Sequence, residues 1–131
     1  MKKSIDKVKE FHHCFRQPVE STPTYPDTGV IKLRVKLAQE ELDEMVQACQ
    51  AENLVGVFDA LVDQLYILFG TAHVFGMADA LEAGLEEVHR SNMTKLGPDK
   101  QPLYREDGKV IKSELYEPPN LEKVLKTIYS V

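Results

Sequence analysis

The stretch that decides the fold is Leu54–Phe75, LVGVFDALVDQLYILFGTAHVF. A run this long without proline predicts a helix, and apolar residues around most of its circumference predict that it is buried on most sides. Asp59 and Asp63 are its only acidic residues, and their spacing of four stacks them on one face. Burying unpaired carboxylates is costly, and no Lys or Arg lies in the stretch to compensate. A bound metal ion is therefore predicted beside these two residues.

A second long helix is predicted just before this stretch, over Val30–Ala51, which contains neither Gly nor Pro. On a helical wheel its polar residues share one arc: Lys36, Gln39, Asp43 and Gln47. Glu41 and Glu44 fall instead among the apolar residues, and Glu40 sits at the border. Carboxylate oxygens from two facing helices suit a hard cation such as Mg²⁺ or Mn²⁺. The predicted metal ligands are Glu40, Glu41, Glu44, Asp59 and Asp63.

Outside the two long helices, apolar spacing and turn residues predict shorter elements. These are a helix over Ser4–Phe15, a proline-containing loop over Gln17–Gly29, a helix over Ala78–Leu96 that stops at Gly97-Pro98, a hairpin pairing Leu103–Arg105 with Lys109–Lys112 around Glu106-Asp107-Gly108, and a last helix ending at Tyr129. The predicted fold is an all-α helical bundle with a small C-terminal β-hairpin, formed by a single domain over residues 1–131.

The helix predicted over Ala78–Leu96 offers a candidate anion site. Its apolar stripe consists of Leu81, Leu85, Val88 and Leu96. Asn92 falls inside this stripe and Lys95 at its edge. A lysine there can approach a phosphate, and an asparagine can donate a hydrogen bond to it. The alternative, in which there is no anion site, is that Asn92 caps a frayed helix end and Lys95 is solvated.

Composition narrows the class of protein. The chain has 131 residues, of which 43% are hydrophobic and 28% charged, as in an ordinary soluble domain. A net charge of −5 argues against a nucleic-acid surface. The two cysteines, Cys14 and Cys49, form no CxxC pair. We find no apolar run of the about 18 residues that a membrane span needs, and no signal peptide. The prediction is a cytoplasmic protein with neither membrane nor nucleic acid as a partner.

These residues resemble a known superfamily. Glu40-Glu41-x-x-Glu44 followed by Asp59-x-x-x-Asp63 resembles the all-α NTP pyrophosphohydrolases, which include MazG, dimeric dUTPases and phosphoribosyl-ATP pyrophosphohydrolases. Four segments resemble a MazG-like subgroup of bacteria and phages: 59–66, 70–72, 87–97 and 105–109. One position departs from the pattern, because the ExxD motif would place Glu at position 60, where this chain has Ala60. Either Asp59 replaces that ligand or the site has lost one.

The resemblance implies an activity. Glu41, Glu44 and Asp63 would bind Mg²⁺, with Glu40 and Asp59 completing the site or holding a second ion. A nucleoside triphosphate, and by similarity to the phage members a deoxynucleoside triphosphate, would be cleaved between its α- and β-phosphates to give the monophosphate and pyrophosphate. Glu40 or Glu41 would orient or deprotonate the attacking water. The resemblance further assigns phosphate contacts to Asn92 and Lys95, and it implies a homo-oligomer, a dimer or a tetramer.

Two other interpretations stay open. A di-iron carboxylate bundle needs two Glu-x-x-His motifs, and the chain contains Glu10-x-x-His13 and Glu86-x-x-His89. However, Glu10 and Glu86 both fall away from the apolar stripes of their helices. The other interpretation is a MazG-like protein that binds nucleotides without cleaving them, its activity lost through the change at position 60.

Overall fold

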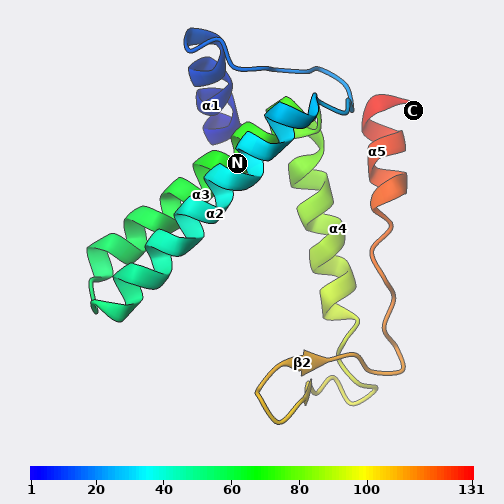
Figure 1. Cartoon of the computed structure of the whole chain (residues 1–131). Helices are drawn as coiled ribbons and strands as arrows, with labels where there is room; N and C mark the ends of the chain where they lie inside the picture. Colours follow the sequence, from blue (N-terminus) through cyan, green and yellow to red (C-terminus); the bar gives the residue numbers. More distant parts are fainter. The chain divides into compact units, whose positions relative to one another are not determined.

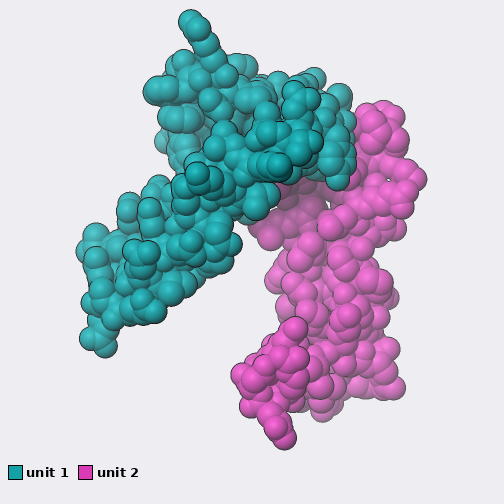
Figure 2. Space-filling view, in the orientation of Figure 1, with its two compact units in different colours: residues 1–79 teal, residues 80–131 magenta.

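The computed structural model describes all residues 1–131 and confirms the all-α class with a small C-terminal hairpin (Figure 1). The elements are α1 Lys2–Cys14, α2 Thr28–Gln50, α3 Leu54–Val74, the short 3-10 helix η1 Ala78–Ala80, α4 Leu81–Met93, β1 Leu103–Tyr104, β2 Val110–Ile111 and α5 Leu121–Tyr129. They fall into two compact units, Met1–Asp79 and Ala80–Val131, which Figure 2 colours separately. Each unit is described by itself below. The assignment of residues 1–131 to one domain stays a prediction.

The first unit is built on a pair of long helices, α2 and α3, which lie side by side (Figure 1). Asn53 starts α3, because its side chain accepts a hydrogen bond from the Gly56 N–H at 3.1 Å. Near the other end of α3, the buried Arg34 of α2 donates to the Ile67 carbonyl at 2.7 Å and to Thr71 Oγ1 at 3.0 Å. These bonds fix the register of the two helices.

Gly70 is the point where three helices meet. A Cβ on this residue would lie 2.5 Å from Arg34 Nη2 of α2 and 2.7 Å from His12 Nε2 of α1. Because glycine carries no Cβ, both side chains can approach the backbone of α3. The result is that α1 and α2 pack against the same turn of α3.

The outer side of α3 is exposed in the single chain, so the expectation of burial on most sides is wrong for the chain by itself. Five residues of α3 are buried: Ala60, Gly70, Ala72, His73 and Val74. Large apolar side chains such as Phe58 (67% exposed) and Leu65 (53% exposed) face solvent. The reason is that α1 and α2 are the only elements that cover α3 in its unit, and they cover one side.

By length and composition, α3 is also able to cross a membrane, contrary to the expectation that no apolar run is long enough. Its two aspartates do not lower the apolar content enough to exclude it. One such helix is weak evidence, since core helices of soluble proteins have the same composition. The cytoplasmic location stays a prediction.

Two buried histidines attach α1 to the rest of its unit. His12 is 2% exposed, and its neutral ring can donate from Nδ1 to the Pro18 carbonyl at 3.0 Å. His73, 4% exposed, lies with Nε2 2.8 Å from the Ile5 carbonyl. Burial lowers the pKa of His12, and the positive charge of Arg34 lowers it further. The folded protein therefore holds His12 in its neutral form.

Acidification is expected to destabilise this unit. The pKa of His12 is lower in the folded than in the unfolded chain, so protons bind the unfolded chain preferentially as the pH falls below about 6.5. Above that pH the neutral His12 makes its full contribution to the free energy of unfolding. It decreases on acidification by at most about 1.4 kcal/mol per pH unit, until the folded pKa is passed. Urea unfolding of His12→Gln between pH 7.5 and 5 is expected to show a weaker pH dependence than the wild type.

The neighbouring His13 supplies the control for that series. It is exposed on the same helix, so His13→Gln is expected to keep the wild-type pH dependence. Equal slopes in all three proteins would contradict the role assigned to His12.

In the second unit, α4 and α5 pack together, and a side-chain network ties the loop before α5 to α4. Glu87 accepts from Arg90 and from the Asn120 N–H, which together hold the pKa of Glu87 at about 2. Helix α4 ends at Met93, earlier than the predicted Leu96. The cause is Thr94, whose hydroxyl donates to the Ser91 carbonyl at 2.6 Å and accepts from the Glu117 N–H at 2.8 Å.

The predicted hairpin is confirmed, in a shorter form. Strands β1 and β2 pair antiparallel, with Leu103 opposite Ile111 and Tyr104 opposite Val110. The turn uses Gly108 at φ +85°, a conformation that favours glycine. Asp107 accepts from the Lys109 N–H at 3.1 Å, which closes the turn.

Candidate metal centre

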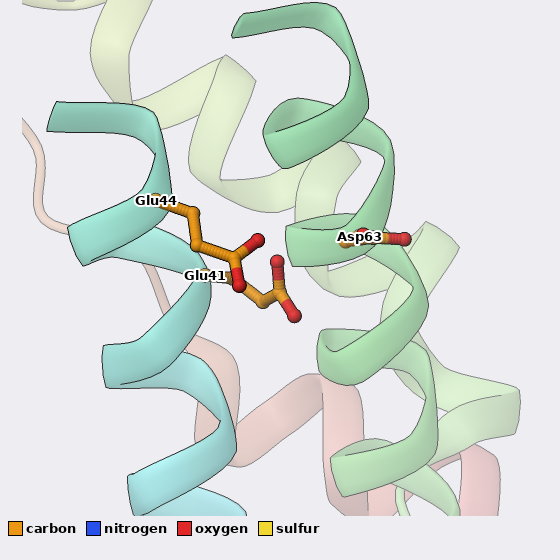
Figure 3. A group of neighbouring side chains, drawn as sticks. All are labelled: Glu41, Glu44 and Asp63. Atoms are coloured by element: carbon orange, nitrogen blue, oxygen red, sulfur yellow. The ribbon is translucent and has the colours of Figure 1, made fainter. Parts of the chain in front are cut away.

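Three carboxylates from two helices converge in the first unit. Glu41 and Glu44 lie on successive turns of α2 and reach toward α3, which carries Asp63 (Figure 3). One oxygen from each residue lies within 4.8 Å of the others. Three negative groups this close repel one another unless protons or a cation intervene. This group of three is called the acidic group below.

Glu41 is the innermost member of the acidic group. Its Oε2 is buried and has no hydrogen-bond partner within the chain. Burial raises the pKa of Glu41, and the charges of Glu44, Asp63 and Asp59 raise it further. A buried carboxylate oxygen without a donor is the orphan that a bound cation would satisfy. The donor set is all oxygen, so the residues present fit a hard divalent cation.

Two other predicted ligands lie outside the acidic group. Asp59 is exposed one turn before Asp63, close enough for its charge to raise the pKa of Glu41. Glu40 is exposed and lines a groove on α2 with Lys36 and Asp43, whereas Glu41 points toward α3. The structure thus places Asp59 near the acidic group. Glu40 is next to Glu41 in the sequence, but its side chain lies outside the acidic group.

Position 60, where this chain departs from the family pattern, is buried in the structure. Ala60 is 1% exposed, and its carbonyl accepts from the Gln64 side chain at 3.1 Å. Gln64 in turn lies 3.5 Å from the Met45 sulfur of α2. Asp59, one residue earlier, keeps its carboxylate in solvent at the rim of the acidic group.

The predicted phosphate contacts belong to the second unit. Asn92 is exposed in the last turn of α4, and Lys95 follows the helix, half-buried. The Lys95 N–H donates to the Asn92 carbonyl at 3.1 Å, so both residues belong to one turn. Both side chains stay predictions as phosphate ligands.

The chain contains no second cluster that would support a di-iron site. The acidic group is its only set of three metal-ligating side chains. His13 and His89 are both exposed, as are Glu10 and Glu86. The structure therefore gives the Glu-x-x-His interpretation no support.

Sequence reasoning did not identify the buried polar contacts that join α1, α2 and α3. Arg34, His12 and His73 are 6%, 2% and 4% exposed, yet as polar residues they were not expected in the core. For Arg34 and His12 the available signal was their common neighbour Gly70, a glycine inside an otherwise regular helix.

Fold and site together define a class: an all-helical protein in which two paired helices gather carboxylates suited to a divalent cation. Residues 8–92, more than half of the chain, match the family model for phosphoribosyl-ATP pyrophosphohydrolase. The chain therefore belongs to the phosphoribosyl-ATP pyrophosphohydrolase family, within the MazG-like all-α NTP pyrophosphohydrolases.

A curated relative is an uncharacterized protein of Acanthamoeba polyphaga mimivirus. It is 32% identical over 92 residues, which are 67% of this chain and 37% of the viral protein. The chain therefore spans little more than a third of that relative's length.

Proposed function

We propose that this protein hydrolyses a nucleoside triphosphate, preferably a deoxynucleoside triphosphate, to the monophosphate and pyrophosphate with Mg²⁺ or Mn²⁺. The observation that carries the proposal is the acidic group, in which a buried oxygen of Glu41 lacks any donor. Family membership supports the reaction class. The similarity of four chain segments to the bacterial and phage MazG-like subgroup supports the choice of substrate.

The residues would divide the work as follows. Glu41, Glu44 and Asp63 would hold the cation, and Asp59 would complete the site or serve a second ion. A bound divalent cation neutralises phosphate oxygens and lowers the pKa of a coordinated water. A carboxylate oxygen that is not bound to the cation, on Glu40 or Glu41, would orient or deprotonate the attacking water. Asn92 and Lys95 would contact the phosphates.

Product analysis tests this proposal. The purified protein is incubated with each common NTP and dNTP, and with phosphoribosyl-ATP, in Mg²⁺, Mn²⁺ or EDTA. Monophosphate and pyrophosphate from a triphosphate, absent in EDTA, are the expected result. Diphosphate and orthophosphate would mean that another bond is broken. Cleavage of phosphoribosyl-ATP alone would replace the substrate proposed here. Nucleotide binding without turnover would favour the non-catalytic interpretation.

We propose further that the protein is a homo-oligomer. The support is the outer side of α3, where Leu54, Val55 and Phe58 are 83%, 79% and 67% exposed. Continuous exposed apolar surface of this kind marks an interaction site. A monomeric mass in light scattering at micromolar concentration would refute the proposal.

A further inference from the structure

Three aromatic rings gather on the surface where α1 meets α3. Phe11 of α1 packs edge-to-face on Tyr66 of α3, with ring centroids 5.6 Å apart and planes at 84°. Phe15, one turn after Phe11, lies over it with centroids 4.4 Å apart and planes at 30°. The three residues are 39%, 63% and 38% exposed for Phe11, Phe15 and Tyr66. We call this set the aromatic cluster.

The aromatic cluster continues the stripe of α3 that carries the acidic group. Tyr66 follows Asp63 by three residues, so it lies on the same side of the helix, about 4.5 Å further along its axis. Helix α1 contacts α3 at two points: the Ile5 carbonyl lies against the His73 ring, and the Phe11 ring packs on the Tyr66 ring. Tyr66 is therefore the member of the aromatic cluster that lies one turn from Asp63, and its contact with Phe11 joins the cluster to the acidic group.

A flat aromatic ring is the occupant that this arrangement fits. Phe11 and Phe15 already stack with their planes 30° apart, and Phe15 is the most exposed of the three. Tyr66 packs edge-to-face on Phe11 and so holds the Phe11 ring in place beneath Phe15. A ligand whose phosphates are bound at the acidic group carries such a ring at its other end, the nucleobase. No side chain of the aromatic cluster offers a charge to a base.

We propose that Phe15, supported by Phe11 and Tyr66, is the platform on which the nucleobase of the substrate stacks. This inference rests on the proposed function and adds the residues that recognise the base. Stacking uses the face of the base, which every base possesses, so the platform favours nucleotides over base-free phosphate esters more than one base over another.

The kinetic test is Phe15→Leu, which keeps an apolar side chain and removes the ring. The expected result is an increase in KM for the nucleoside triphosphate of about tenfold, with kcat little changed. The matched control is Tyr25→Leu, because Tyr25 is also an exposed aromatic packed edge-to-face on another ring, that of Phe75, and lies outside both the aromatic cluster and the outer side of α3. A KM for Phe15→Leu equal to that of the wild type would overturn the proposal, as would equal increases in both variants.

A binding measurement separates this inference from the proposed activity. Aromatic ring signals are followed by NMR while AMP is added, and ribose 5-phosphate serves as the ligand without a base. Shifts of the Phe11, Phe15 and Tyr66 signals with AMP alone are expected. Such shifts without pyrophosphate release would refute the activity and support the platform. Pyrophosphate release without shifts would refute the platform alone. Signals that respond to protein concentration and not to AMP would assign the cluster to a contact between two copies, and would also refute it.

Discussion

Replacing Glu41 by glutamine is expected to lower the rate of pyrophosphate release at least about 100-fold, since even partners one step removed from a metal commonly contribute 10–100-fold. The change removes one negative charge from the acidic group and keeps the size of the side chain. Burial and the charges of Glu44 and Asp63 raise the pKa of Glu41, so its ionised form is disfavoured in the metal-free fold. The variant's melting temperature in EDTA should therefore equal or exceed that of the wild type.

The combination of lost activity and retained stability distinguishes a metal ligand from a structural residue. Asp43→Asn is the matched control, because Asp43 is an exposed acid on the outer side of the same helix, hydrogen-bonded to Gln39 at 2.8 Å. It removes the same charge from α2 and should leave turnover within about twofold of the wild type, a surface substitution being close to neutral. If Glu41→Gln retained activity, or if both variants lost it equally, the assignment of the acidic group would be wrong.

Replacing Gly76 by alanine is expected to reduce the free energy of unfolding by about 3 kcal/mol or more. Gly76 has φ +70°, where an L side chain is strained, and its Cβ would lie only 1.8 Å from the Thr22 carbonyl oxygen. That oxygen belongs to the backbone of the loop that crosses the end of α3, tied there by Thr24 N–H donating to the Phe75 carbonyl at 2.9 Å. The loop must move to admit a methyl group. Urea unfolding followed by circular dichroism measures the loss.

Substitutions at two other glycines separate the steric contact with Thr22 from backbone strain and from helix propensity as causes of that loss. Gly108→Ala tests strain by itself, because Gly108 has φ +85° and no atom within 4 Å of its Cβ position. Gly29→Ala tests helix propensity, because Gly29 lies in α2 with no neighbour within 4 Å. We expect a cost of about 1 kcal/mol for Gly108→Ala and no loss for Gly29→Ala. If Gly76→Ala cost no more than Gly108→Ala, the contact with Thr22 would not be what excludes a side chain.

The positions of the helices follow from local pattern, and the sequence predicted the ends of α1, α2 and α3 to within two residues. The exception was α4, which stops at Met93 and not at Leu96. The reason is a contact distant in sequence: Thr94 bonds the backbone of Glu117, and no pattern within the helix records that bond.

For the site as well, local pattern predicted some features and the packing of the helices decided others. Periodicity placed Glu41 and Glu44 on the face of α2 that turns toward α3, and spacing placed Asp63 on a stripe of α3. It placed Glu40 at the border of the polar arc and therefore kept it among the predicted ligands beside Glu41. The packing of α2 on α3 decided the question by directing Glu41 inward and leaving Glu40 exposed.

The sequence by itself determined the all-helical class, the Asp-Gly hairpin and the two acidic pairs, because each is a property of neighbours along the chain. Only the tertiary structure decided that Glu41 Oε2 has no donor, that Ala60 is buried and that Phe11 meets Tyr66. Those three results depend on which surfaces of separate helices face each other. Helix packing is set by the whole set of side chains at a contact, down to a single missing Cβ at Gly70.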